Sequence, residues 1–319
     1  MRISALPFVV AAARLSAASR MEAAKLVGGF LGLDKARERA DGAGKLTLIG
    51  AGFSRTGTKS TEAALLELGH KIYDTRSILE NNHADRWVDA AERLKRGDDG
   101  AVAALLAEME AAGYTATLDF PMNLFGHSLA ALRPDAKILF TTRNLDAWFA
   151  SWYAVNDVLG IFVLRPWSWL VDFKFTEPIC QAFGFDMIVA RYPDHVRRPL
   201  PWFERLKTLP SLDPPGSKER WIAFYERTRD ALERDYPDRF LAFDVKAGWA
   251  PLLDFLGVDD VARVASPFPR VNDMNSLRAV RATMDVIGLG LPLWVGLFAY
   301  VAARLLKALL FGKTKPKRS

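Results

Sequence analysis

The chain has 319 residues, is 50% hydrophobic and 25% charged, and carries a formal net charge of +6. This composition excludes intrinsic disorder and a disulfide scaffold, and a lone cysteine, Cys180, excludes any multi-cysteine metal site. Residues 1–45 hold 8 basic and 4 acidic residues, and residues 276–319 hold 8 and 1, which leaves 27 basic and 32 acidic residues between them. Because the centre is acidic, we expect a membrane surface rather than nucleic acid as the partner of the basic ends.

The two ends predict helical segments outside the main domain. Residues 1–45 are rich in alanine and basic side chains, and they predict an amphipathic helix rather than a signal peptide. Residues 286–303 form 18 residues without a charge, and six basic residues follow them. We expect residues 284–319 to form a hydrophobic helix or hairpin with a basic tail. Residues 284–311 would then attach the protein to the cytoplasmic face of a membrane, as a single span or a peripheral anchor. A helix packed on the domain is the alternative.

Between these ends, short apolar runs alternate with helical patterns. The apolar runs predict strands at residues 45–50, 114–118, 137–142 and 240–245. The helical patterns cover residues 60–68, 84–112, 144–155, 218–236 and 249–257. Strands that alternate with helices predict an α/β fold, with a parallel sheet covered on both faces in three layers. We expect one such domain, with helical insertions, over residues 46–283.

A glycine-rich segment, GAGFSRTGTKST at residues 50–61, joins the first predicted strand to the first predicted helix. In this position consecutive backbone N–H groups and the helix dipole favour an anion. The nucleotide triphosphatase pattern GxxxxGK[ST] places lysine directly after its second glycine. Here Thr58 takes that position and Lys59 comes one residue late. The segment predicts a phosphate-binding loop of P-loop topology, with a Rossmann turn as the alternative.

Ser54-Arg55-Thr56-Gly57-Thr58 resembles the loop of sulfotransferases that use 3′-phosphoadenosine 5′-phosphosulfate (PAPS). In that family the loop binds the 5′-phosphosulfate end of the donor. Arginine stands here where the family has lysine, and the resemblance implies that Arg55 stabilises charge on the departing phosphate. Arginine is not a general acid, so its expected role is electrostatic. Together with the residues that follow, the loop is expected to contact the donor through Ser54, Arg55, Thr56, Gly57, Thr58, Lys59 and Ser60.

A second segment, RNLDAWFAS at residues 143–151, resembles the 3′-phosphate site of the same family. Arg143 offers a bidentate fork to a phosphate, and Ser151 adds a hydroxyl two helical turns further on. Taken alone, the pattern is also that of an arginine at a strand end and a serine on a helix face. Two phosphate motifs in this order favour PAPS, whose ribose carries phosphates at both ends.

A third segment, Asp119-Phe120-Pro121, falls where cytosolic sulfotransferases carry Thr-His-Leu-Pro with a catalytic histidine. The resemblance implies that Asp119 accepts a proton from the substrate; a carboxylate that orients Arg55 or a loop hydroxyl is the alternative. Further similarity to a bacterial and fungal sulfotransferase-like branch extends the resemblance over residues 46–280. His83 and His127 are weaker candidates for a base, because a capping or surface role fits each of them.

These observations predict a sulfotransferase-like enzyme that moves a sulfuryl group from PAPS to a hydroxyl or amine of a lipophilic acceptor. The expected reaction is in-line displacement without a metal or a covalent intermediate. We expect the acceptor pocket to use Trp148, Trp152 and Tyr153, with the apolar run at residues 159–169. The alternatives are a P-loop nucleotide kinase or hydrolase, and a catalytically inactive, nucleotide-binding, membrane-associated scaffold.

Overall fold

The computed structural model describes residues 44–163, 176–184 and 217–271, and also residues 296, 300, 301 and 304. The chain forms two compact units, Met1–Asp273 and Met274–Ser319. The first unit holds a five-stranded parallel sheet of order β2-β3-β1-β4-β5. Its strands are β1 (Leu48–Gly50), β2 (Ile72–Tyr73), β3 (Ala116–Thr117), β4 (Lys137–Thr141) and β5 (Phe240–Phe243).

Helices occupy the connections between successive strands, as parallel pairing requires. Between β1 and β3 lie α3 (Thr58–Glu67), α4 (Thr75–Glu80), α5 (Ala84–Leu94) and α6 (Gly100–Ala111). Between β3 and β5 lie α7 (Gly126–Leu132), α8 (Leu145–Val163), α9 (Thr176–Ala182), α11 (Ser217–Asp235) and the 3-10 helix η4 (Pro237–Arg239). After β5 come the 3-10 helix η5 (Val245–Ala247), α12 (Trp249–Leu256) and α13 (Val261–Val264). The predicted α/β fold with a parallel sheet and helical insertions is confirmed.

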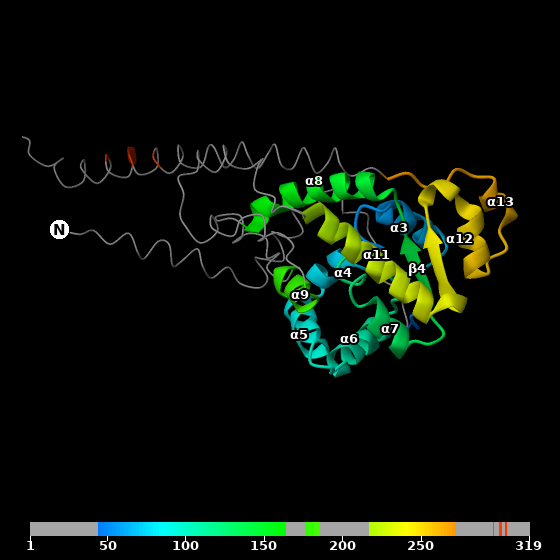
Figure 1. Cartoon of the computed structure of the whole chain (residues 1–319), viewed down its shortest axis with the longest axis horizontal. Helices are drawn as coiled ribbons and strands as arrows, with labels where there is room; N and C mark the ends of the chain where they lie inside the picture. Colours follow the sequence, from blue (N-terminus) through cyan, green and yellow to red (C-terminus); the bar gives the residue numbers. More distant parts are fainter. Residues whose placement is uncertain are drawn as a thin grey trace, which may run out of the picture. The chain divides into compact units, whose positions relative to one another are not determined.

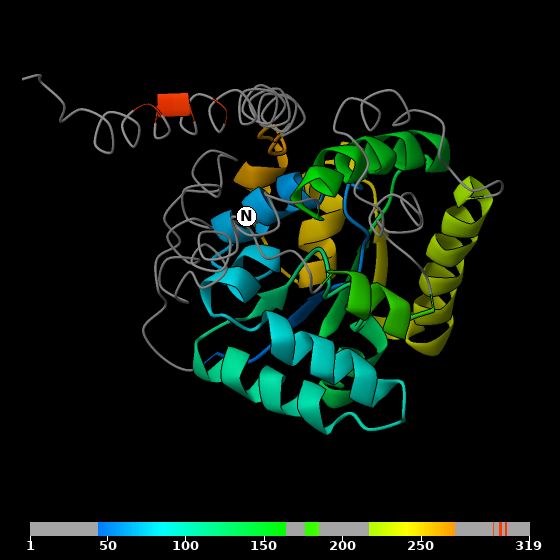
Figure 2. The ribbon, with the colours of Figure 1, turned by 90° about the vertical axis from the view of Figure 1, so that its left-hand side faces the viewer.

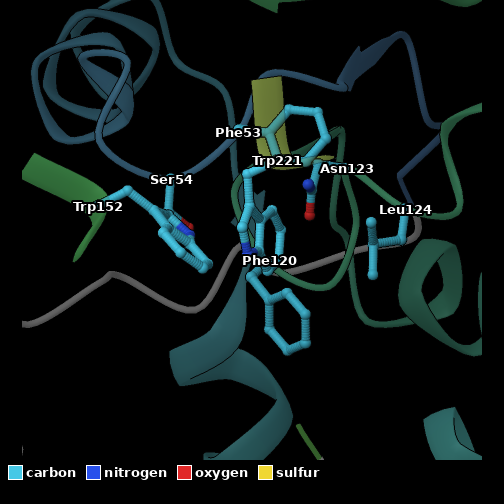
Figure 3. Close-up of a pocket in the computed structure, with 7 residues that line it drawn as sticks. All are labelled: Phe53, Ser54, Phe120, Asn123, Leu124, Trp152 and Trp221. Carbon is cyan, nitrogen blue, oxygen red and sulfur yellow. The ribbon is translucent and has the colours of Figure 1, made fainter. Parts of the chain in front are cut away.

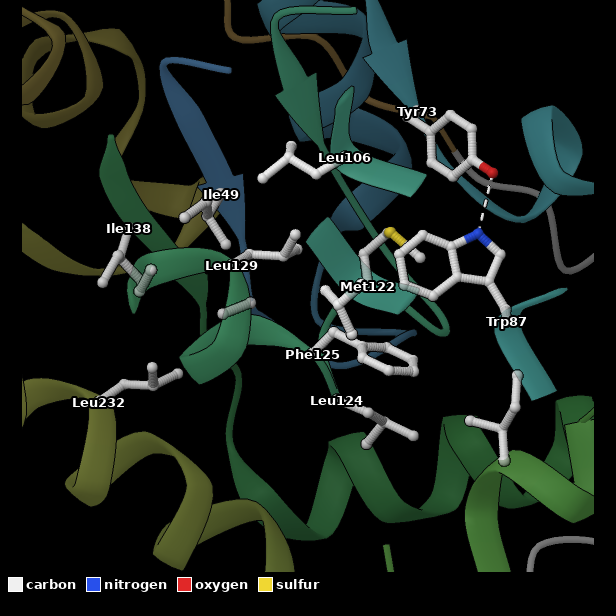
Figure 4. Packing of buried hydrophobic residues seen from close by; sticks show 14 of the residues in the cluster. Ile49, Tyr73, Trp87, Leu106, Met122, Leu124, Phe125, Leu129, Ile138 and Leu232 are labelled. Atoms are coloured by element: carbon white, nitrogen blue, oxygen red, sulfur yellow. Dashed lines mark hydrogen bonds between the residues drawn. The ribbon is translucent and has the colours of Figure 1, made fainter. Parts of the chain in front are cut away.

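Side chains of neighbouring strand residues point to opposite faces of the sheet and give it two cores. Leu48 joins a cluster with side chains of α3 and α12, whereas Ile49 joins a larger cluster with α5, α6, α7 and α11. Figure 1 shows α12 and α11 on opposite sides of β4 and β5, and Figure 2 shows α5 and α6 side by side. The larger cluster includes a buried hydrogen bond from Trp87 Nε1 to the Tyr73 hydroxyl at 2.9 Å (Figure 4). The helices therefore cover both faces in three layers.

The helical pattern predicted over residues 84–112 is confirmed, and it forms two helices. It is broken into α5 and α6 by a turn in which Gly97 adopts a φ of 81°. Asp98 fixes this turn, because its carboxylate accepts a hydrogen bond from Gly100 N at 2.9 Å and pairs with Arg93 at 2.7 Å. The local bonds of Asp98 compete with a continuous helix.

The predicted terminal segments lie almost wholly outside the described residues. Of residues 1–45 the structure describes only 44 and 45, and of residues 284–319 only 296, 300, 301 and 304. Within the described parts of the chain, none of the helices has the length and apolar composition needed to cross a membrane. The expected transmembrane helix therefore gains no support from them.

Candidate active site

Three segments meet beyond the carboxyl ends of the three central strands. β1 lies between β3 and β4. The strands that follow β1 in sequence first extend the sheet on one side of it, as β2 and β3, and then on the other side, as β4 and β5. Ligands of open parallel sheets bind at such a switch point. Here the loop after β1 contacts the residues that follow β3 and β4. Thr56 Oγ1 lies 2.5 Å from Thr141 Oγ1 at the end of β4, and Ser54 Oγ donates to the carboxylate of Asp119 after β3.

The loop of residues 51–57 needs glycine at two positions. A Cβ on Gly52 would lie 2.1 Å from Thr141 Oγ1, so only glycine allows the loop to pass this closely over β4. Gly57 has a φ of 102° and caps the N-terminus of α3, where a Cβ would also meet Val245 at 2.7 Å. Arg55 has a φ of 75°, which is uncommon for a residue with a side chain. This backbone brings the N-terminus of α3 to the loop, the arrangement that favours a bound phosphate.

The two predicted phosphate motifs lie against each other. Arg55 Nε donates to Ser151 Oγ of α8 at 3.1 Å, and Arg143 Nη1 donates to the carbonyl oxygen of Arg55 at 3.0 Å. Arg143 is exposed, and Arg55 and Ser151 are half-buried. Two guanidinium groups and one hydroxyl from distant parts of the sequence thus meet beside the loop. There they can bind two anionic groups of one ligand.

Asp119 contacts the same loop through its carboxylate. Its Oδ1 accepts hydrogen bonds from Ser54 Oγ and from Phe120 N at 2.8 Å, and its Oδ2 accepts one from Thr58 Oγ1 at 3.3 Å. Burial raises the pKa of the Asp119 carboxyl, and Lys59 and the hydrogen bond from Ser54 offset only part of this rise. A carboxylate with a raised pKa, in contact with a phosphate-type loop, is suited to accept a proton.

Three side chains expected to contact the donor are engaged by protein groups instead. Thr56 Oγ1 donates to the Phe53 carbonyl, and Ser60 Oγ accepts from Val271 N at 3.1 Å. The Lys59 ammonium lies 2.8 Å from Glu62. Burial disfavours the charged form of Lys59, yet neighbouring carboxylates raise its pKa overall. Direct contact of these three side chains with a donor stays a prediction. The clearest contribution of these residues to donor binding is that of their backbone N–H groups.

A pocket next to Ser54 is lined mainly by aromatic side chains (Figure 3). Its residues come from the loops after β1 and β3 and from α8 and α11; they are Phe53, Ser54, Phe120, Asn123, Leu124, Trp152 and Trp221. Trp152 is placed as expected, whereas neither Trp148 nor Tyr153 lines this pocket. Trp148 is fully buried beneath the loop, where its Nε1 donates to the Ser54 carbonyl at 3.0 Å.

Sequence reasoning missed most of the pocket. Three of its residues come soon after Asp119 in the sequence: Phe120, Asn123 and Leu124. Their closeness in sequence to the candidate base was the signal that could have found them. Trp221 had no such signal, because its helix carries several aromatic residues and its contact with Trp152, at 4.0 Å between ring centroids, depends on the tertiary fold. The side chains of residues 159–169 lie outside the described part of the chain.

The two histidine candidates have structural partners away from the loop. His83 precedes α5, and its Nδ1 lies 2.8 Å from the Tyr73 hydroxyl. Burial lowers the pKa of His83. His127 lies 3.3 Å from the Asp235 carboxylate. Both positions fit the capping and surface roles weighed above. In the parts of the chain that the structure describes, no group of three or more His, Cys, Asp or Glu side chains is placed to hold a metal ion.

Comparison with known proteins gives two findings. A family model described as "Sulfotransferase domain" matches residues 47–277. The chain is also 26% identical over 207 residues to "Ava biosynthesis cluster protein M" of Aspergillus versicolor, a match that covers 64% of this chain and 74% of that protein. The family match includes the loop after β1, Asp119, Arg143 and Ser151.

Proposed function

The chain belongs to the sulfotransferase domain family, and we propose that it transfers a sulfuryl group from PAPS to a hydroxyl or amine of a lipophilic acceptor. The observation that carries this proposal is the position of Asp119. Its carboxylate accepts a hydrogen bond from Ser54, and Ser54 belongs both to the phosphate-type loop and to the lining of the aromatic pocket. A base at this junction lies between a donor held by the loop and an acceptor held by the pocket.

The donor side provides charge for a nucleotide with two separate phosphate groups. The α3 N-terminus and Arg55 would hold the 5′-phosphosulfate, and Arg143 with Ser151 would hold the 3′-phosphate. The hydrogen bonds from Arg55 to Ser151 and from Arg143 to the loop support this assignment, because they fix both guanidinium groups before a ligand arrives. Fixed donors lose little conformational freedom when the ligand binds.

In the proposed reaction the acceptor oxygen or nitrogen attacks sulfur in line with the bridging oxygen of the phosphosulfate. A bond forms between the acceptor atom and sulfur while the sulfur–oxygen bond breaks, and its electron pair leaves on the 5′-phosphate. Asp119 takes the acceptor's proton, and Arg55 stabilises the negative charge on the departing phosphate. Ser54, which contacts Asp119, holds the carboxylate at the point where the two substrates meet.

The kinase alternative requires a lysine that reaches the transferred phosphate. Lys59 comes one residue late in the loop, and its ammonium lies 2.8 Å from Glu62 and 3.8 Å from Asp74. These carboxylates compete with any phosphate for the lysine. The observed geometry therefore favours sulfuryl transfer over phosphoryl transfer from a nucleoside triphosphate.

Calorimetric titration of the full chain with 3′-phosphoadenosine 5′-phosphate (PAP) and with ATP–Mg²⁺ tests the proposed donor. We expect PAP to bind and ATP–Mg²⁺ to bind at least about 10-fold more weakly, because ATP has no 3′-phosphate for Arg143. Preferential binding of ATP–Mg²⁺ would contradict the proposal and favour the kinase. Binding of PAP without sulfuryl transfer to any acceptor would instead favour the inactive scaffold.

Membrane attachment is a separate part of the proposal and rests on the sequence of residues 284–311. Their uncharged run and adjoining basic side chains fit an anchor on an anionic surface. Sedimentation with phosphatidylserine vesicles tests it: we expect the full chain to co-sediment at low salt, and a chain cut after residue 283 to remain in the supernatant. Equal behaviour of the two chains would contradict the anchor.

A further inference from the structure

The hydroxyl groups of Ser54 and Thr58 both donate to the Asp119 carboxylate. Ser54 Oγ donates to Oδ1, and Thr58 Oγ1 donates to Oδ2 at 3.3 Å, so each carboxylate oxygen is bound by one hydroxyl. Ser54 lies in the loop after β1 and is half-buried, and Thr58 is the buried first residue of α3. The proposed base and the proposed phosphosulfate site therefore share two hydroxyl groups.

These two hydroxyl groups cannot serve the base and a bound phosphate at the same time. A hydroxyl has a single proton to donate, and while that proton points to Asp119 the hydroxyl offers a phosphate oxygen only its lone pairs. A phosphate group at the α3 N-terminus thus competes with Asp119 for both protons. The positive end of the helix holds the phosphate there, and its charged oxygens are strong acceptors, so both hydroxyls are expected to turn toward it.

The other neighbours of Asp119 belong to the protein and stay in place when the hydroxyls turn. Phe120 N donates to Oδ1 at 2.8 Å, Lys59 of α3 attracts the carboxylate, and Asp74 at the start of α4 repels it. Hydrogen bonds to a charged carboxylate lower its pKa, and the bond from Ser54 does so here. Loss of the hydroxyl bonds therefore raises the pKa of Asp119 and makes its carboxylate a stronger base.

We propose that Ser54 and Thr58 are positioning residues that bind Asp119 in the ligand-free protein and release it when the phosphate of the donor accepts their hydrogen bonds. This inference rests on the proposed function, since the donor and the base are those of sulfuryl transfer. Each hydroxyl proton stays on its own oxygen and only changes its acceptor. The acceptor substrate therefore meets a carboxylate free of both hydroxyls only after the donor has bound.

Calorimetric titration of the full chain with PAP, in buffers of different ionisation enthalpy, tests the inference. The buffer dependence of the heat gives the number of protons taken up per PAP bound, and PAP supplies the 5′-phosphate without any transfer reaction. Between pH 4 and 8 we expect Asp119 to take up part of a proton from the buffer when PAP binds. Asp119→Asn should abolish this part, so the difference between the two proteins measures the uptake by Asp119.

Hydroxyl variants separate the exchange of hydrogen bonds from the charge of the phosphate. Thr58→Val and Ser54→Ala each remove one bond to Asp119 before PAP arrives, so each should lower the uptake by Asp119 by roughly half. The uptake by Asp119 is measured in each variant against the same variant carrying Asp119→Asn. Because uptake is counted per PAP bound, a loss of affinity in a variant does not alter it.

Two controls complete the experiment. Thr58→Ser keeps the hydroxyl and should retain the full uptake. Thr47→Val is the matched control, because it removes an exposed hydroxyl that binds the Thr115 carbonyl before β1, at the opposite end of the strand from the loop. Undiminished uptake in both Thr58→Val and Ser54→Ala would overturn the inference and leave PAPS as the proposed donor. Failure of the wild-type chain to bind PAP would instead contradict the proposed function, and the inference with it.

Discussion

The site has two sides that differ in how their polar groups are paired. On the donor side Arg55 binds Ser151, and Arg143 binds the loop carbonyl of Arg55, so the charged groups are held by the protein. On the acceptor side the rings pack on one another, and Asn123 Oδ1 has no partner among the described residues. Preorganised charge suits a ligand with fixed phosphate groups, whereas a mainly aromatic pocket selects its ligand by shape. The two sides therefore suit ligands of different chemistry, an anionic one beside the guanidinium groups and an apolar one beside the rings.

The largest expected effect comes from substitution of Asp119, the residue between the donor side and the acceptor side of the site. Asp119→Asn should lower the rate of sulfuryl transfer by roughly 10²–10⁴-fold, because an amide cannot accept the proton. The amide still fits beside Ser54, so the affinity for PAP should change little. Steady-state rates and calorimetry measure the two effects. Asp135→Asn, an exposed aspartate that pairs with Lys45, is the control and should retain full activity. An active Asp119→Asn enzyme would remove Asp119 as the base.

The next effect should be confined to the donor side. Arg143→Ala should weaken PAP binding by about 2 kcal/mol, the scale of a lost charge-assisted hydrogen bond. Arg143→Lys should recover only part of this loss, because an ammonium cannot form the bidentate contact. Unchanged PAP affinity of Arg143→Ala would remove this arginine from the site.

A smaller effect is expected from the support beneath the loop. Trp148→Phe removes the hydrogen bond from Nε1 to the Ser54 carbonyl but keeps a ring against Phe53 and Tyr225. The free energy of unfolding should fall by about 1 kcal/mol in urea titrations. PAP affinity should fall only a few-fold, since Trp148 does not line the site. A loss of PAP binding as large as that of Arg143→Ala would show that this tryptophan contributes directly to donor binding.

The smallest effect is a shift of a pH profile. Burial raises the pKa of Asp119, so the carboxylate ionises at a higher pH than an exposed aspartate. The transfer rate should therefore rise with pH through this pKa and then reach a plateau. Lys59 lowers the pKa of Asp119, and Lys59→Met should move the midpoint to still higher pH. Initial rates between pH 4 and 9 provide the measurement. A midpoint that stays in place or moves to lower pH would contradict this coupling.

The same contrast explains how much of the site could be predicted from the sequence. The donor-side motifs lie within two short stretches that each follow a predicted strand, so local sequence placed Arg55, Arg143 and Ser151 at one edge of the sheet. The partners of individual side chains could not be predicted, because Ser60 meets Val271 through the tertiary fold. The pocket combines four separate elements, and the burial of Trp148 beneath the loop depends on their packing.

For the fold, the alternation of apolar runs and helical patterns was enough to predict a parallel sheet. β4 and β5 have clear apolar runs, and both were found. β2 has only two residues, Ile72 and Tyr73, which is too short for any periodicity. The turn between α5 and α6 depends on the side chain of Asp98, and the helical pattern over residues 84–112 did not mark it.

Transfer of a radiolabelled sulfuryl group from PAPS to an aromatic alcohol tests the central claim most directly. The full chain is incubated with labelled PAPS and a panel of aromatic alcohols, and the labelled sulfate ester is separated and counted. We predict formation of the ester by the wild-type chain at a rate that Asp119→Asn lowers by roughly 100-fold or more. A wild-type chain that binds PAP yet forms no labelled ester with any of these alcohols would contradict the account.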